Sequence, residues 1–236
     1  EVLAMDIDAA AIVEMLRRKL NARPREAHPM RKFAGNDRRP GGDRRPGGDR
    51  HSHPPIIHAQ VADMRLPPAQ LVTLAEKFGY YPKLVDFAVT NFAIHYLCND
   101  VRDIRGFLTF VARMLKINGV FMFTTFDGKR IFDLLRDTAP DETYSMMEND
   151  QVKYAIKKLY RSQDLALFGQ TIAVKLPFAE TMVSEPLANI NAIVAVAKKL
   201  GFAVVHMGNF AGYFTEFGKT GSDLASKLTE VDRKYI

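Results

Sequence analysis

Three apolar segments of the chain each end in a polar residue of a type that binds ligands. Asp6 follows VLAM, Asp63 follows IIHAQVA, and Asn91 follows LVDFAVT. A fourth apolar segment ends in TTFD, residues 124–127. An open α/β sheet binds its ligands beyond the carboxyl ends of its strands, so we expect these residues to share one cleft.

Both aspartates fit two roles. A carboxylate that ends a strand of a nucleotide-binding sheet typically hydrogen-bonds ribose hydroxyls, and Asp6 is placed to do so. The same residue would equally serve to end the strand or to cap a following helix. Asp63 has the same two interpretations, because aspartate is common in turns for its backbone hydrogen bonds. The residues alone do not decide between them.

The segment NFAIHY, residues 91–96, combines aromatic rings with directional hydrogen-bonding groups. Proteins bind flat purines with such a combination, in which rings stack on the base and polar groups meet its edge. The alternative is that Phe92 and Tyr96 belong to the core and His95 is their hydrogen-bonded polar neighbour. Both interpretations stay open.

Three other kinds of site are not supported. GKT at 218–220 lacks the earlier glycine of a phosphate-binding loop, since Tyr213 occupies that position. The histidines at 28, 51, 53 and 58 have neither a second cysteine nor a fixed ligand spacing, so no metal site is expected. A G-x-S-x-G motif is also missing from the sequence, which argues against a serine hydrolase.

Composition predicts one domain over residues 1–236, because 47% of the residues are hydrophobic. The net charge of the whole sequence is +6. Between Arg17 and Arg50 there are 12 Lys/Arg and 4 Asp/Glu, a local net charge of +8, so the rest of the sequence has a net charge of about −2. RRPGGD occurs twice, at 38–43 and 44–49. We interpret 23–55 as a disordered basic insertion, because its residues bury too little apolar surface to offset ordering.

Cys98 is the single cysteine, so an internal disulfide is impossible and a reducing compartment is expected. No apolar run has the length of a membrane span, and no signal-peptide pattern opens the sequence. We therefore expect a cytoplasmic protein without a membrane partner.

Strand and helix patterns alternate up to about residue 136, which predicts an open, mostly parallel sheet with helices on both faces. Asp100 is expected to cap one of the helices. A hairpin, a helix and a last strand complete the pattern. The expected strands are 2–6, 56–63, 84–91, 120–125, 155–161, 168–176 and 202–207, and the expected helices are 8–20, 69–79, 101–115, 130–136 and 186–200.

Taken in order, these strand ends resemble the mRNA cap guanine-N7 methyltransferase family over nearly the whole chain. The resemblance implies that Asp6 holds the ribose of S-adenosylmethionine and that Ala62 and Asp63 contact its adenine. The family's Q-F-x-x-H-Y motif is similar to NFAIHY, with Asn91 in place of glutamine. Asn91 and Phe92 then lie beside the cofactor.

The same resemblance supplies residues for the guanine. His95 and Tyr96 would face the cap, as would Glu185 in SEPL and Tyr213 in AGYFTEF. LKINGVFMFTTFDGKRIFDLL and LFG at 167–169 also resemble family segments. The stretch around TTFDGKR is most similar to the capping enzymes of large cytoplasmic DNA viruses, in which this domain is the C-terminal part of a longer polypeptide.

The implied fold is an α/β, Rossmann-like class I methyltransferase with a mostly parallel, doubly wound sheet. The family's Gly-rich loop, D-x-G-x-G-K-G-G-D, has no match in the sequence, so we expect the first strand to be missing. The glycine pairs at 41–42 and 47–48 follow the wrong strand to replace it.

The implied reaction is S-adenosylmethionine-dependent methylation of guanine N7 in the mRNA 5′ cap, with catalysis by positioning alone. The expected partners are the capped 5′ end of mRNA and other capping-enzyme domains or a stimulatory subunit. Two alternatives stay open. One is a methyltransferase that acts on a small molecule or a tRNA base, and the other is an inactive, methyltransferase-like scaffold subunit.

Overall fold

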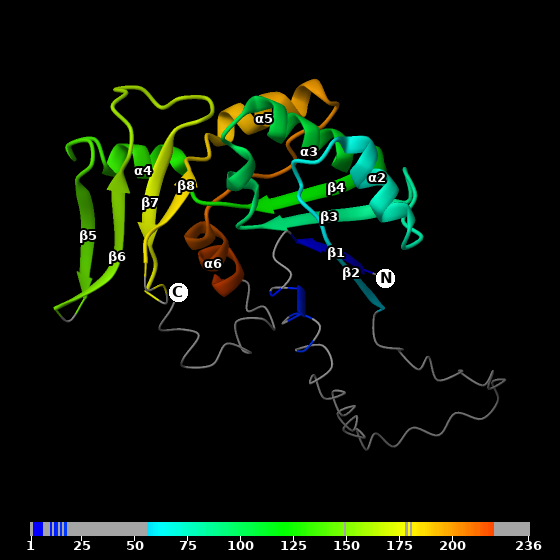
Figure 1. Cartoon of the computed structure of the whole chain (residues 1–236), viewed down its shortest axis with the longest axis horizontal. Helices are drawn as coiled ribbons and strands as arrows, with labels where there is room; N and C mark the ends of the chain where they lie inside the picture. Colours follow the sequence, from blue (N-terminus) through cyan, green and yellow to red (C-terminus); the bar gives the residue numbers. More distant parts are fainter. Residues whose placement is uncertain are drawn as a thin grey trace, which may run out of the picture.

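The computed structural model describes residues 2–6, five positions between 10 and 17, 56–148, 150–177, 179 and 181–219 (Figure 1). The expected basic insertion lies outside these residues, as does most of the helix expected after Asp6. No helix in the described part of the chain has both the length and the apolar character to cross a membrane.

Two pairs of parallel strands carry the predicted ligand-binding ends. β1 (Val2–Asp6) pairs with β2 (Ile57–Val61), and β3 (Val85–Asn91) pairs with β4 (Leu115–Thr124). The strand directions and the mixed α/β class are as the sequence predicts. The single continuous sheet is not seen, because among the described strands β1 and β2 form one two-stranded sheet and β3 and β4 another.

Three helices gather on one side of β3 and β4: α2 (Pro68–Glu76), α3 (Val101–Met114) and α5 (Ile190–Lys199) (Figure 1). The side chain of Asp100 caps α3 by accepting a hydrogen bond from the backbone N–H of Arg102, as predicted. The apolar stripe of α3 is fully buried and forms the centre of the main core, together with residues of α2, α5 and the turn after β3. These core residues include Leu71, Ile94, Ile104, Leu108 and Ile193.

β4 begins five residues earlier than expected. Asn118 and Gly119 precede the strand expected at 120–125, but they lie inside β4, where the register between β3 and β4 shifts. Asn118 has a φ of 63°, a conformation that asparagine tolerates better than most residues. This segment is therefore an irregularity within the strand, and the pairing of β3 with β4 continues to Thr124.

A separate antiparallel sheet follows α4 (Gly128–Leu134). Its strands are β5 (Thr143–Glu148), β6 (Gln151–Lys158), β7 (Thr171–Lys175) and β8 (Val183–Pro186), in that order across the sheet. The predicted hairpin corresponds to β6 and β7. The patterns of β5 and β8 were missed, because β5 is largely exposed and β8 has only four residues.

Two predictions near the end of the chain were wrong. The helix expected from Pro186 begins at Ile190, where Asn189 caps it, and Pro186 is the last residue of β8. The strand expected at 202–207 is not formed, since residues 202–209 run without regular structure and the side chain of Val205 is 92% exposed. A strand needs a neighbour for its backbone groups, and no described strand pairs with this segment. The chain then enters α6 (Phe210–Lys219).

Gly128, the first residue of α4, is hydrogen-bonded to the segment after β8. Its backbone N–H donates to the carbonyl oxygen of Ala188 at 3.2 Å. A Cβ atom at Gly128 would lie only 2.4 Å from that oxygen. The close approach therefore requires glycine, and it joins the antiparallel sheet to the parallel strands.

Gly128→Ala is expected to lower the free energy of unfolding by about 1–3 kcal/mol, because backbone atoms must move apart. Gly106→Ala in α3 is the matched control, since its Cβ would meet nothing within 4 Å and alanine favours a helix by up to about 1 kcal/mol. Calorimetric melting of the protein would measure both. Equal melting temperatures for Gly128→Ala and the wild type would contradict the close approach.

Candidate functional site

His95, Tyr96 and Glu185 come together although they are far apart in the chain. The Tyr96 hydroxyl donates a hydrogen bond to Oε1 of Glu185 at 3.0 Å. Nε2 of His95 lies 3.6 Å from Oε2 of the same carboxylate. The His95 and Tyr96 rings are 4.1 Å apart between centroids. We call these three residues the His–Tyr–Glu cluster.

The end of β3 places the two aromatic members. Phe92 has a φ of 48°, and its backbone N–H donates to the carbonyl oxygen of Thr124 at 2.9 Å, which turns the chain away from the sheet. The 3₁₀ turn η1 (Ile94–Leu97) follows. Ile94 and Leu97 are buried in the main core and anchor this turn, so His95 and Tyr96 are held between the core and β8.

Glu185 comes from the antiparallel sheet. It lies in β8 opposite Ile172 of β7, and only 8% of its surface is exposed. The following helix, α5, begins at Ile190 and is capped by Asn189. Glu185 therefore does not serve as a carboxylate at the N-terminus of that helix. A buried carboxylate without a cation is costly unless hydrogen bonds compensate it, and Tyr96 supplies one of them.

Burial controls the charge of His95, which is 2% exposed. It lowers the pKa of the imidazole, although the neighbouring Glu185 acts in the opposite direction. Neither ring nitrogen has a hydrogen-bond partner among the described residues. Burial also raises the pKa of the Tyr96 hydroxyl, with help from the charge of Glu185 and their hydrogen bond. The cluster therefore offers a neutral imidazole, a phenol and a carboxylate.

An aromatic group lies next to this cluster. The ring of Phe92 is 5.5 Å from that of Phe126 and 5.9 Å from that of Phe210, on which it stacks. Phe126 is also 5.8 Å from the His95 ring. The sequence analysis named Phe92 and placed TTFD, which contains Phe126, in the same cleft, but it gave Phe126 no role of its own. Nothing in the sequence pattern pointed to Phe210.

The predicted cofactor residues occupy the ends of both parallel pairs. Asp6 ends β1 and pairs with Val61, which places Asp63 two residues beyond the neighbouring strand. Ala62, which lies between Val61 and Asp63 in the sequence, is buried. Asn91 ends β3 in the other pair, and its side-chain oxygen accepts from the Thr124 hydroxyl at 3.3 Å.

Asp63 has a partner of its own. Arg65 donates to both carboxylate oxygens, with Nε at 3.0 Å from Oδ1 and Nη2 at 2.8 Å from Oδ2. These hydrogen bonds lower the pKa of the Asp63 carboxyl. The pair is exposed, so it keeps Asp63 ionised and oriented and adds little to stability.

Tyr213 lies on α6, with its ring 4.9 Å from that of His206. The same helix begins with Phe210, which stacks on Phe92, and it lies below the ends of β3 and β4 in Figure 1. Lys129 and Arg130, at the start of α4 after β4, form ion pairs with Asp133 and Asp127. Within the described residues, no group of three His, Cys, Asp or Glu side chains could hold a metal ion.

His95→Gln is expected to make the protein less sensitive to acid. The lowered pKa of His95 means that below its ordinary value of 6.5 the unfolded chain takes up a proton that the folded chain does not. The wild type should therefore lose stability as the pH falls through about 6.5, and the glutamine variant should lose less. Denaturant unfolding at about pH 7.5 and about pH 5.5 measures the difference. An identical loss in both proteins would show that His95 titrates normally.

Comparison with known proteins gives a consistent family. Residues 68–234 match the model of the mRNA (guanine-N(7))-methyltransferase domain. The relatives include mRNA-capping enzymes of African swine fever virus, from a pig isolate in Kenya and a tick isolate in South Africa. Each is 29% identical over 189 residues, which are 78% of this chain and 22% of the relative. The chain thus spans about a fifth of the length of these viral relatives, and it belongs to the mRNA (guanine-N(7))-methyltransferase domain family.

Proposed function

We propose that this domain transfers a methyl group from S-adenosylmethionine to guanine N7 of an mRNA 5′ cap. The observation that carries the proposal is the His–Tyr–Glu cluster beside exposed aromatic rings. Polar groups of this kind suit the edge of a base, and the rings suit its face. Membership of the family supports the same reaction.

Glu185 is the proposed reader of the guanine edge. The ring N–H and exocyclic amine of guanine are donors, and a carboxylate is acceptor-only. Tyr96 uses one position on Oε1 and leaves the other lone pairs free to accept. The ring nitrogens of buried His95 are the next polar atoms at the site. His95 and Tyr96 then orient the base, and Tyr213 on α6 packs nearby.

The reaction requires only that the protein position the two reactants and stabilise the charge that develops on the base. Guanine N7 is already an unprotonated nucleophile, so no general base or metal is required. When bound, S-adenosylmethionine supplies an electrophilic methyl group whose bond to sulfur breaks as the bond to N7 forms. Holding a nucleophile in line at near-attack distance contributes roughly 7–11 kcal/mol. The Glu185 carboxylate also favours the positive charge that develops on the methylated ring.

The proposed cofactor residues are Asp6, Ala62, Asp63, Asn91 and Phe92. Asp63 suits a nucleoside because its lowered pKa keeps the carboxylate ionised, as a hydrogen-bond acceptor just beyond the end of β2. Asn91 commits its oxygen to Thr124, which leaves its amide N–H groups as donors. The ring of Phe92 is nearly half exposed and offers a stacking face at the same end of β3.

For the partners, we propose the capped 5′ end of mRNA as substrate and further capping domains as neighbours. The relatives are named mRNA-capping enzymes, and this chain matches about a fifth of their length. Such a polypeptide would carry other steps of capping beside this one. The host cytoplasm is the compartment that we propose from the viral relatives.

We also propose that one more parallel strand completes the sheet between β1 and β3. Among the described strands β1 pairs only with β2 and β3 only with β4, which leaves an open edge on each. Large apolar side chains on these strands, including Val2, Phe87 and Val89, are exposed. Parallel sheets in proteins are normally buried on both faces, so such exposure indicates an incomplete sheet. A Gly-rich turn after the added strand would bring backbone amides to the cofactor.

Hydrogen exchange tests the added strand. We expect slow exchange of the β1 and β3 amides in the full polypeptide and fast exchange in residues 1–236 alone, because unpaired edge amides exchange with water. Binding of S-adenosylmethionine should be weaker in the shorter chain for the same reason. Equal protection of β1 and β3 in both proteins would show that no further strand pairs there.

Glu185→Gln tests the guanine site, measured in the full polypeptide. The affinity for S-adenosylmethionine should stay nearly unchanged, and methylation of capped RNA should fall about 10- to 150-fold. That loss corresponds to about 1.5–3 kcal/mol for one charge-assisted hydrogen bond.

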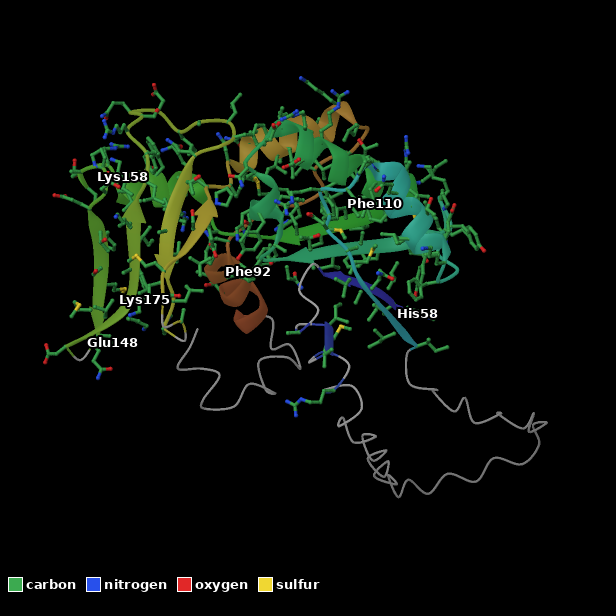
Figure 2. The ribbon with its side chains drawn as sticks, in the orientation of Figure 1. His58, Phe92, Phe110, Glu148, Lys158 and Lys175 are labelled. Carbon is green, nitrogen blue, oxygen red and sulfur yellow. The ribbon has the colours of Figure 1, made fainter. Side chains whose placement is uncertain are left out.

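Glu148→Gln is the matched control, since Glu148 is an exposed glutamate on β5 at the far end of the antiparallel sheet (Figure 2). It should leave both measurements unchanged. Normal cap methylation by Glu185→Gln would remove this residue from the site and weaken the proposed reaction.

A further inference from the structure

The segment 164–170, between β6 and β7, is hydrogen-bonded to both parts of the chain that form the His–Tyr–Glu cluster. One part is η1 with His95 and Tyr96, and the other is β8 with Glu185. η1 follows β3 of the parallel pair, whereas β8 belongs to the antiparallel sheet, so contacts between the two parts must fix the distance between η1 and β8.

On the η1 side the contact is made by Gly169. Its backbone N–H donates to the carbonyl oxygen of Cys98 at 2.8 Å, and the Cys98 N–H donates to the carbonyl oxygen of His95 at 2.8 Å. Gly169 has a φ of +81°, and a Cβ there would lie 3.3 Å from the carbonyl oxygen of Asn99. Glycine thus permits the segment to reach the end of η1.

On the β8 side the contact is made by Gln170. Its carbonyl oxygen accepts from the backbone N–H of Leu187 at 2.7 Å, two residues after Glu185. Pairing of Ile172 with Glu185 continues the same connection along β7 and β8. One dipeptide therefore contacts η1 through its first residue and β8 through its second.

The side chain of Gln170 holds the shape of the segment. It is 6% exposed, accepts from the N–H of Ala166 at 3.0 Å and donates to the carbonyl oxygen of Asp164 at 3.2 Å. Asn189 adds a second anchor, because its side-chain amide donates to the carbonyl oxygen of Ala166 at 3.1 Å. These bonds satisfy backbone groups of the segment and do not touch the cluster itself.

We propose that Gln170 is a positioning residue that holds Glu185 against Tyr96 and His95 through the segment 164–170. The inference deepens the proposed function, on which its effect on cap methylation rests. Loss of the Gln170 side-chain bonds would let β8 move relative to η1. A displacement of about 1 Å at a positioned group can reduce a reaction rate about 100-fold.

The test compares Gln170→Met with Gln163→Met in the full polypeptide. Methionine keeps the length of the side chain and removes its hydrogen bonds, and Gln163 is an exposed residue just before the same segment. The first measurement does not depend on any reaction. Fluorotyrosine placed at position 96 reports the pKa of that hydroxyl by ¹⁹F NMR, and burial together with the charge and hydrogen bond of Glu185 raises this pKa.

We expect the Tyr96 pKa to fall in Gln170→Met, as it should in Glu185→Gln, and to stay unchanged in Gln163→Met. The KM for capped RNA should rise about tenfold or more in Gln170→Met, while the affinity for S-adenosylmethionine stays within about twofold. The effects of Gln170→Met and Glu185→Gln on the KM should not add, because both act through the same carboxylate.

The outcomes separate the two claims. An unchanged Tyr96 pKa in folded Gln170→Met overturns the positioning inference, whatever the RNA assay gives. A lowered Tyr96 pKa with normal cap methylation supports the positioning and contradicts the proposed function of the site. If Gln170→Met does not fold, Asn189→Ser takes its place. Serine still caps α5 but is too short to reach Ala166, so the same fall in the Tyr96 pKa is required.

Discussion

The hydrogen bond between Tyr96 and Glu185 joins positions 89 residues apart, and the candidate site exists only because the fold brings them within 3.0 Å. Three features of the fold bring Tyr96 and Glu185 together. The left-handed turn at Phe92 directs η1 away from the sheet, the core holds Ile94 and Leu97, and hydrogen bonds around residues 164–170 and Gly128 attach the antiparallel sheet to the parallel strands. None of these contacts involves a charged pair, so the arrangement depends on backbone hydrogen bonds and packing.

The sequence predicted the elements well where a strong periodic pattern coincided with a local signal. The helix after Asp100 shows this, because an apolar stripe, a capping aspartate and a buried core all agree. The segment 202–207 shows the opposite case. Its composition suits a strand, but a strand exists only through a partner, and the described strands offer none. Local pattern cannot reveal whether a neighbour is present.

The candidate site was predictable to the extent that its residues follow strands. Asp63, Asn91 and Phe92 could be singled out in this way, and the family resemblance supplied Glu185 and Tyr213. Gln170 and Phe210 could not be found from the sequence. In the sequence, a buried glutamine that orders a loop cannot be distinguished from an exposed one such as Gln163. Only the hydrogen bonds in the structure distinguish the two.

Burial of His95 has a consequence for the charge of the proposed guanine site. A protonated imidazole 3.6 Å from Glu185 would pair with that carboxylate and compete with the guanine donors. It would also repel the positive charge that forms on the base during methyl transfer. Because burial lowers the pKa of His95, the imidazole is neutral near pH 7 and the negative charge of Glu185 stays available to the base. The same burial that we expect to destabilise the folded chain in acid thus keeps the proposed site compatible with a cationic product.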